Sequence, residues 1–387
     1  MKAKDVEKFL KLAQEKFDLA ELGDDFTKFE AKMKKEISKP KKVKIKDFER
    51  FEVLGLDALG KLSKDLKNAS LTLNRAEIRY LVDLYYQIQK YRTAMSKQAD
   101  SMQEEPHELF DHFKNQAYTI EDQIKVAMRT FTENHPVGKW MLSNKGVGEI
   151  TAAGLIAYID IERARTAGAI WSYAGMDPNR EWLGREKSEK IVSEVIEKHA
   201  EGKKRPVITD MMLAEISILT GWKTSYLRES SINDKGKISK DALVKAVSKI
   251  PYNASFKVLC WKIGQNFLKQ KNKKDAFYAQ LIQPRLDYEN KKNLLLDYKD
   301  QAEKKLRECK IKSEVVLPFY EKGMLPPGHI QQRALNHAVK IFLSHVHHVM
   351  YCHHYKELPP VPFAIAHMGH TDMIEVPNLE HFDNEVK

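Results

Sequence analysis

The middle of this 387-residue chain contains the stretch NKGVGEITAAGLIAYI at residues 144–159. Two glycines, Gly146 and Gly148, stand two positions apart and precede small and apolar residues, a pattern that predicts a tight turn opening a buried helix. Backbone amides at such a helix start approach an anion closely, most simply a backbone phosphate. Small residues also let helices pack closely. Both a phosphate contact and a packing role are open at this point.

The charge balance of the chain is basic. Lys and Arg number 65 against 54 Asp and Glu, a formal net charge of +11 at pH 7. This excess favours polyanions as partners, although lysines also serve as solvated surface. Cys260, Cys309 and Cys352 form no Cys-x-x-Cys pair, which fits a reducing compartment. The N-terminus has no apolar core of signal-peptide length, and no uninterrupted apolar run anywhere approaches the length of a membrane span. We therefore expect a soluble, cytoplasmic protein with no membrane partner.

Apolar residues recur at helical spacing along most of the chain, and no long segment alternates with a period of two. We therefore predict an all-α fold in three parts: an N-terminal helical domain at residues 1–72, an antiparallel coiled-coil hairpin at residues 73–134, and a helical body at residues 135–387. Residues 38–46, SKPKKVKIK, carry five lysines and no acid. This segment is either a solvated linker or a phosphate-contacting segment.

Two long periodic segments predict the hairpin. Asn74 and Glu77 have the spacing of an N-cap and an N3 acid at the start of the first segment. Apolar residues then recur three and four apart on both sides of Pro106, as in an antiparallel coiled coil, at Ile78, Leu81, Tyr85, Ile88, Met95, Ala99 and Met102, and at Phe110, Phe113, Ala117, Ile120, Ile124, Ala127 and Phe131. Arg92 interrupts this seam, and we expect it either to weaken the seam locally or to mark a contact point.

The central stretch and two segments after it resemble known families. GVGEITAAGLIA at residues 146–157, followed by WSYAGMDP at residues 171–178, resembles the C-terminal domain of the insertion-sequence transposases that work with a bridge RNA. The order of glycine turn, helix, loop and LGREK at residues 183–187 is similar to the Nop domain of archaeal and eukaryotic guide-RNA ribonucleoproteins. The Tas proteins of tandem-interspaced-guide-RNA systems, found in prokaryotes and their viruses, are similar to both, and this chain resembles them over roughly residues 75–370.

The resemblance implies an RNA-guided DNA-binding protein in its nuclease-free form. Its Nop-like body would hold a guide RNA, and base pairing would select the target DNA, so the protein needs no base-reading code of its own. In Nop proteins a coiled coil precedes the RNA-binding domain, which favours a homodimer through residues 73–134. A hairpin that folds only on itself is the alternative.

The candidate RNA contacts fall into four groups. They are Lys145, Gly146 and Gly148 for phosphate contact, Arg180, Arg185, Lys187 and Lys190 for the guide-RNA turn, Lys257 and Lys262 beside aromatic residues, and Arg333, His337 and Lys340 for a second RNA strip.

Two helices provide the last two groups. In the helix that begins near residue 251, lysines alternate with aromatic residues, as suits stacked bases and phosphates, although we expect Trp261 itself in the core. The helix from Pro326 to about Tyr355 carries polar donors three and four apart, at Arg333, His337, Lys340, Ser344, His347, Tyr351 and His354. This donor stripe either tracks an RNA backbone or is a solvated helix face.

We expect no catalytic residue, metal or cofactor. Zinc-type ligands recur toward the C-terminus at His345, His348 and Cys352, followed by His367 and His370. No recognised finger spacing supports a zinc site, and the helical positions equally fit a core seam. No strand pattern presents the carboxylates of an RNase H-type nuclease.

The sequence also departs from the transposase pattern. After Tyr-Ala-Gly-x-x-Pro the bridge-RNA transposases use a serine, whereas this chain has NREW at residues 179–182. This departure argues against transposase chemistry, so an RNA-guided transposase or recombinase that cuts or covalently joins DNA is the alternative function rather than the main one. A helical scaffold with incidental charge is a third.

Overall fold

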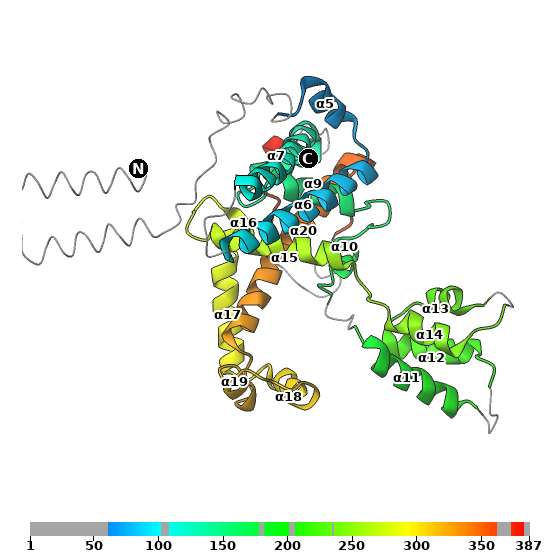
Figure 1. Ribbon diagram of the computed structural model, residues 1–387. Coiled ribbons are helices and arrows are strands. Elements are labelled where there is room, and N and C mark those ends of the chain that lie inside the picture. The colour runs from blue at the N-terminus through cyan, green and yellow to red at the C-terminus, as the bar shows by residue number, and fades with distance from the viewer. Residues whose placement is uncertain are drawn as a thin grey trace, which may run out of the picture. The chain divides into compact units, whose positions relative to one another are not determined.

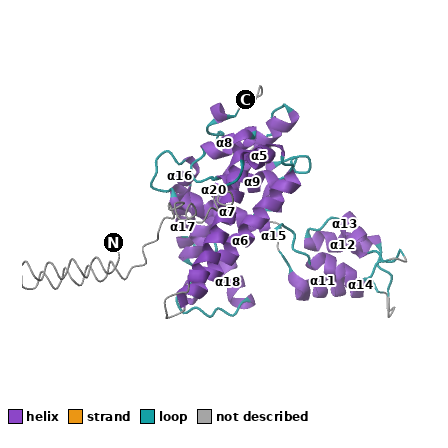
Figure 2. Ribbon diagram, turned by 45° about the horizontal axis from the view of Figure 1, so that its top comes forward, coloured by secondary structure: helices purple, strands orange, loops and turns teal. Residues whose placement is uncertain are grey.

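A computed structural model describes residues 61–101, 108–177, 182–200, 206–233, 236–361 and 373–382. All of them belong to the second of two units into which the chain divides, Lys61–Lys387. The helices and the lysine-rich segment predicted within residues 1–60 lie outside the described residues. As predicted, the described residues are helical and contain no strand, apart from an isolated bridge between Ile232 and Ile238 (Figures 1 and 2). The three domain boundaries stay predictions.

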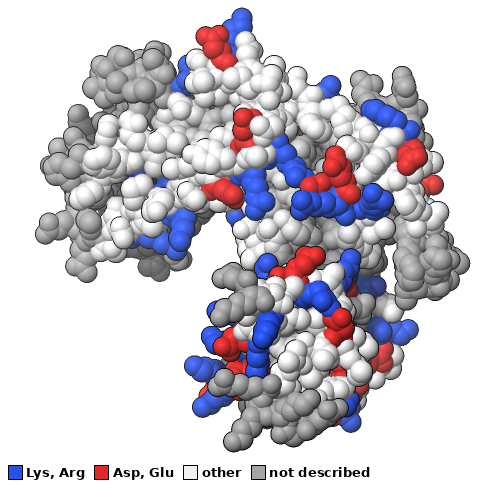
Figure 3. Space-filling view, turned by 90° about the vertical axis from the view of Figure 1, so that its right-hand side faces the viewer, with Lys and Arg blue, Asp and Glu red and all other residues white. Residues whose placement is uncertain are grey.

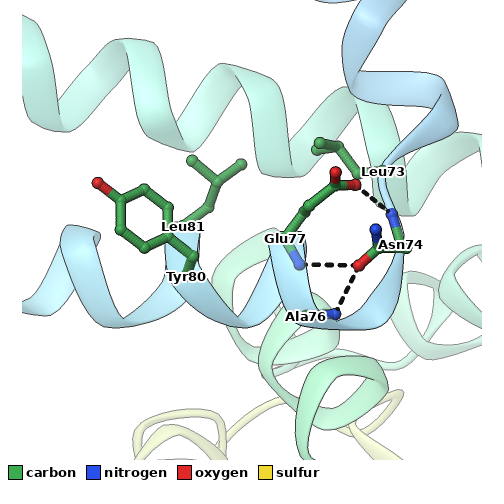
Figure 4. A pocket seen from close by; sticks show the side chains of 6 residues that line it. All are labelled: Leu73, Asn74, Ala76, Glu77, Tyr80 and Leu81. Carbon is green, nitrogen blue, oxygen red and sulfur yellow. Dashed lines mark hydrogen bonds between the residues drawn. The ribbon is translucent and has the colours of Figure 1, made fainter.

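A short helix, α5 (Lys64–Ala69), and a 3-10 turn, η2 (Ser70–Thr72), lead into the long helix α6 (Arg75–Ser101). The start of α6 has the predicted capping box (Figure 4). Asn74 Oδ1 accepts hydrogen bonds from the backbone N–H groups of Ala76 and Glu77 at 2.9 and 3.0 Å. Glu77 Oε2 in turn accepts from the backbone N–H of Asn74 at 2.7 Å. Three backbone donors at the helix start are thereby satisfied.

Helix α7 (Glu108–Asn134) packs along α6, so the predicted helical hairpin is present. The buried residues of the hairpin lie only at its base, at Ile78, Val82 and Tyr85 of α6 and Ile124, Ala127, Met128, Phe131 and Thr132 of α7. Farther out, Phe110 and Phe113 are 43% and 54% exposed. The predicted seam is therefore not buried along its whole length, because α9 packs only against the base. Coiled-coil geometry and dimerisation through the hairpin stay predictions.

The body of the protein is built around α9 (Glu149–Tyr158), which follows α8 (Pro136–Ser143). Residues 151–158 of α9 are all buried, and the helix packs against α6, α7, α8 and α15. A Cβ on Gly154 would lie 2.8 Å from Leu259 Cδ2, so the small residue permits a close helix approach. The predicted buried helix after the glycine turn is confirmed.

The other helices of this core are α10 (Ala167–Tyr173), α15 (Ala254–Lys269), α16 (Phe277–Gln280), α17 (Ile282–Leu294) and α20 (Pro327–Tyr355). Helix α20 contacts α8 and all four of the others. A smaller cluster beside α17 includes Tyr298, Leu325 and Ile330, near α18 (Lys299–Glu308) and α19 (Leu317–Glu321). The C-terminal segment with η3 (Leu379–His381) joins the core through Phe382 and through Pro377 O, which accepts a 2.8 Å hydrogen bond from Trp140 Nε1.

Four helices between residues 184 and 248 have a hydrophobic core of their own. They are α11 (Gly184–Lys198), α12 (Asp210–Thr220), α13 (Thr224–Ser231) and α14 (Lys240–Ser248). Their buried residues, among them Val192, Leu213 and Leu243, form a cluster separate from the one around α9. Within the described part of the chain, no helix is long and apolar enough to cross a membrane.

Candidate nucleic-acid interface

The glycine turn joins α8 to α9. Asn144 is buried and its Nδ2 donates a 2.7 Å hydrogen bond to Trp140 O. Gly146 has a φ of +99°, and a Cβ there would lie 2.9 Å from Phe267 Cδ1, so glycine is required for both conformation and packing. Gly148, the N-cap of α9, is less crowded: apart from Gly148 itself and its chain neighbours, no described atom lies within 4 Å of the position its Cβ would take. These contacts favour the packing role for Gly146 and leave Gly148 accessible.

Charged side chains already surround the start of α9. Glu149 pairs with Lys125 and Arg129, each at 3.3 Å. Burial opposes ionisation of Glu149, but a hydrogen bond from its own backbone N–H and the charge of Lys125 hold its pKa below the usual value. Lys145 forms an ion pair with Asp275. A phosphate at this helix start would meet the Glu149 carboxylate, and Lys145 would have to leave Asp275 to contact it. Phosphate binding by this turn stays a prediction.

A charged cluster ties α17 to α20. Glu289 is 1% exposed. Its Oε1 accepts from Arg285 Nε at 2.9 Å, and its Oε2 accepts from Arg333 Nε at 2.7 Å and from the Tyr298 hydroxyl. One carboxylate thus faces two guanidinium groups, so the cluster keeps an excess of positive charge. Each guanidinium retains donors that Glu289 does not use.

His337 and Lys340 follow Arg333 on α20 and are half-buried. Burial lowers the pKa of His337 to about 4, and the charge of Arg285 acts in the same direction. Burial also lowers the pKa of Lys340, whose Nζ lies 5.3 Å from the centre of the Trp171 ring. At neutral pH His337 is therefore an uncharged donor or acceptor, and it could contact an RNA strand without neutralising a phosphate.

The donor stripe of α20 is mostly half-buried rather than fully solvated. His347 is buried, and its Nε2 lies 3.0 Å from Ala164 O. Only His354 among the stripe residues is exposed. The reason is that α10 and α17 pack against α20: Arg333 bonds to Glu289 of α17, and Lys340 lies over the ring of Trp171 of α10. RNA contact by Arg333, His337 and Lys340 stays a prediction.

Helix α15 presents aromatic and cationic groups together, as predicted. Lys257 Nζ lies 4.1 Å from the centre of the Tyr252 ring, and Lys262 Nζ lies 3.3 Å from that of Tyr86. Burial lowers the pKa of Lys262. The expectation that Trp261 belongs to the core is wrong, because its side chain is 51% exposed. Successive residues in a helix are turned by about 100°, and the core-facing side is occupied by Phe256, Leu259, Cys260, Ile263 and Phe267.

The candidates on α11 are all exposed. Lys187 Nζ lies 3.0 Å from Glu308 Oε2, and Lys190 faces Glu194 at 3.9 Å. Arg185 lies in the first turn of the helix. Arg180 lies outside the described residues. Exposed cations of this kind are available to a polyanion at little structural cost.

The zinc alternative finds no support in the geometry of His345. Its Nδ1 lies 2.8 Å from the Tyr278 hydroxyl and its Nε2 lies 3.0 Å from Ile374 O, so both ring nitrogens have partners. Burial lowers its pKa to about 4. In the described ranges no group of three or more His, Cys, Asp or Glu side chains is placed to hold a metal ion. His367 and His370 lie outside those ranges.

Sequence reasoning missed Arg285 and Glu289. Their spacing of four residues is visible in the sequence, but it is equally typical of a solvated ion pair on a helix surface. Their importance depends on Arg333, which is 44 residues beyond Glu289. On the face drawn in Figure 3, Lys and Arg side chains are mixed with Asp and Glu rather than gathered into one basic patch. On this face the positive sites are therefore local.

The fold and these sites define an all-helical protein in which most of the described candidate residues are cationic. Residues 139–223 match the model of the transposase IS116/IS110/IS902 family. This segment, which runs from α8 to just beyond α12, is therefore transposase-related, in agreement with the likeness seen at residues 146–157 and 171–178. No curated protein and no solved structure matches the chain. The likenesses to Nop domains and Tas proteins stay predictions.

Proposed function

We propose that this protein holds a guide RNA on its helical body and directs it to DNA by base pairing, without a nuclease of its own. The protein would contact mainly backbone phosphates and stacked bases, while the guide would read the target. The transposase-related segment at residues 139–223 and the net charge of +11 are both compatible with action on nucleic acid.

One observation carries the proposal: the exposed indole of Trp261 lies on the same helix as two lysines that are themselves placed against aromatic rings. Val258, one turn before Trp261, is also 52% exposed. A planar ring beside cations is the arrangement that proteins use to bind single strands, because bases stack on the ring while the cations meet phosphates. This surface accepts any base, as a guide-holding protein requires.

The second candidate function is an RNA-guided transposase or recombinase. The family match at residues 139–223 favours it. Against it stands the sequence NREW at residues 179–182, where the bridge-RNA transposases use a serine. The two functions differ in outcome, because a recombinase leaves cut or covalently protein-linked DNA and a guide-holding protein leaves the DNA intact.

The test is to purify the protein from cells that carry its own locus, extract the bound nucleic acid, and sequence it. We expect a uniform short RNA that maps to a repeat array near the gene. Recovery of no RNA, or of random cellular fragments, would contradict the proposal and favour a scaffold. The purified complex should then be mixed with matching DNA and Mg²⁺, and nicked or protein-linked DNA would favour the recombinase.

A further inference from the structure

Three arginines line a cavity where α6, α9 and α10 meet. The cavity has a volume of about 400 Å³, and its charged lining residues are Arg75, Arg79, Arg163 and Asp160. Among the lining side chains, three positive charges stand against one negative charge, and Asp83 lies near Arg79 from outside the lining. The remaining lining includes the rings of Tyr158 and Tyr173 and several small residues. A cavity of this size has room for roughly one nucleotide unit.

Arg79 is held from two sides. Its guanidinium carbon lies 4.6 Å from the centre of the Tyr158 ring, and its Nε lies 4.0 Å from Asp83 Oδ2. The Tyr158 hydroxyl donates a 2.9 Å hydrogen bond to Asp83 Oδ1. Since Tyr158 ends the buried helix α9, its ring is a fixed platform. Stacking of this kind orders the planar guanidinium before a ligand arrives, and an ordered fork suits a phosphate.

Asp160 gathers the other two arginines. Its Oδ2 lies 2.9 Å from Arg75 Nη1 and 3.6 Å from Arg163 Nε. Each guanidinium carries five N–H donors, so one carboxylate leaves most of them available. The Arg163 side chain is 89% exposed and that of Arg75 is 50% exposed. Asp160 thus keeps the two arginines close together, although their mutual repulsion would otherwise separate them.

An aromatic wall completes the cavity. The Tyr173 ring packs 5.2 Å from the ring of Phe256, and its hydroxyl accepts a 2.9 Å hydrogen bond from Asn253 Nδ2. We propose that this cavity binds a phosphate group of an RNA strand, with Arg75, Arg79 and Arg163 as its ligands and Tyr173 beside the adjoining nucleoside. The inference deepens the proposed function, on which it rests for the identity of the strand.

The test compares Arg79→Gln/Arg163→Gln with Lys90→Gln/Lys97→Gln, which removes the same charge from exposed positions farther along α6. The probe is a single-stranded RNA of one sequence, made with a 5′-phosphate or with a 5′-hydroxyl. For the arginine variant we expect affinity about tenfold weaker per lost contact. The slope of log K against log salt should fall by about 0.7 per contact. The lysine variant should show a smaller loss of affinity and a smaller fall in this slope.

The two probes distinguish the source of the phosphate. If the arginine changes abolish a preference for the 5′-phosphate, the cavity holds the strand end. If they weaken both probes equally and beyond the lysine control, it holds an internal phosphodiester. Equal losses of RNA affinity in the arginine variant and the lysine variant would overturn the proposal. Arg163→Gln alone, at an exposed side chain, repeats the measurement if the double variant does not fold.

Failure of the proposed function gives a different result from failure of the cavity proposal. If the wild-type chain binds neither RNA probe, the guide-holding function is contradicted. Thermal unfolding of the wild type with adenosine monophosphate, and with adenosine as the control, then tests whether the cavity binds a phosphate. A rise in melting temperature with the monophosphate in the wild type, absent in Arg163→Gln, would support a phosphate site. No rise in the wild type would overturn it.

Discussion

At the scale of single residues, Trp261 is the most informative side chain for the proposed function. Replacement of an exposed ring that stacks on a base should weaken RNA binding by about 1–3 kcal/mol. The free energy of unfolding should change by less than about 0.5 kcal/mol, because the ring contributes little to the core. RNA titration and urea unfolding of Trp261→Ala measure the two quantities. Tyr91→Ala, at a 67% exposed ring on α6, is the control. Unchanged RNA affinity in Trp261→Ala would rule out the stacking role.

Glu289 is the residue on which the junction of α17 and α20 depends. Glu289→Gln removes the negative charge between Arg285 and Arg333. Loss of one partner from a fully buried ion pair costs about 3–5 kcal/mol, but these arginines are about a third exposed. We therefore expect Glu289→Gln to lower the free energy of unfolding by about 1–3 kcal/mol at pH 7, measured by urea unfolding. Glu197→Gln, at an exposed position, should have no such effect.

The same variant makes a prediction about pH. Burial opposes the charge of Glu289, but hydrogen bonds from Tyr298 and Arg333 outweigh it and hold its pKa below the ordinary value of 4.5. The carboxylate therefore stabilises the folded state fully above pH 4.5, and this stabilisation is lost as the pH falls through the lower pKa of the folded state. The difference between wild type and Glu289→Gln should shrink in that acidic range. A difference that stays constant there would show that the charge is not its source.

At the scale of the element, Arg92 holds the two helices of the hairpin together. It forms an ion pair with Glu121 of α7, its Nη1 donates to Tyr118 Oη at 2.9 Å, and its guanidinium carbon lies 4.2 Å from the centre of that ring. Of the two alternatives for this break in the apolar seam, the contact point is confirmed. The side chains of Arg92 and Glu121 are only 16% and 12% exposed, so water does not fully screen their attraction.

A double-mutant cycle with Arg92→Ala and Glu121→Ala tests this contact. We expect a coupling free energy of about 0.5–3 kcal/mol from thermal unfolding. The exposed pair of Lys114 and Asp111, at 3.3 Å on α7, is the control and should give about 0.3–0.5 kcal/mol. Coupling in the first cycle no larger than in the second would mean that the hairpin does not depend on Arg92.

At the scale of the whole molecule, the two hydrophobic cores should respond separately to a cavity. Leu213 on α12 and Leu155 on α9 are both 0% exposed, and each belongs to a different core. Replacement of either leucine by alanine should lower the free energy of unfolding of its own core by about 2–5 kcal/mol. Hydrogen exchange should then show Leu213→Ala lowering protection in α11–α14 while α9 keeps its protection. Equal loss of protection in both cores after Leu213→Ala would mean that they unfold as one unit.

Local chemistry made much of this fold predictable. The helical periodicity, the capping box of Asn74 and Glu77, and the buried helix after Gly146 and Gly148 all depend on residues within one or two turns of one another. The pair of Lys257 and Tyr252 is local in the same way, whereas Lys262 meets Tyr86 of α6, which is distant in the chain. The segment similar to transposases was also readable, because a contiguous run of residues carries it.

Only the tertiary structure decided which of these side chains are accessible. The donor stripe of α20 has a regular spacing in the sequence, yet His347 is buried, His354 is exposed and the other stripe residues are half-buried, because α10 and α17 pack against this helix. Arg92, which interrupts the apolar seam, forms an ion pair because the packing of α7 against α6 places Glu121 beside it. The cavity of Arg75, Arg79 and Arg163 likewise combines residues from α6 and from the loop after α9. Periodicity states which residues share a helix face, but burial and ion pairing depend on neighbours that are distant in the chain, and a single sequence does not specify which neighbours these are.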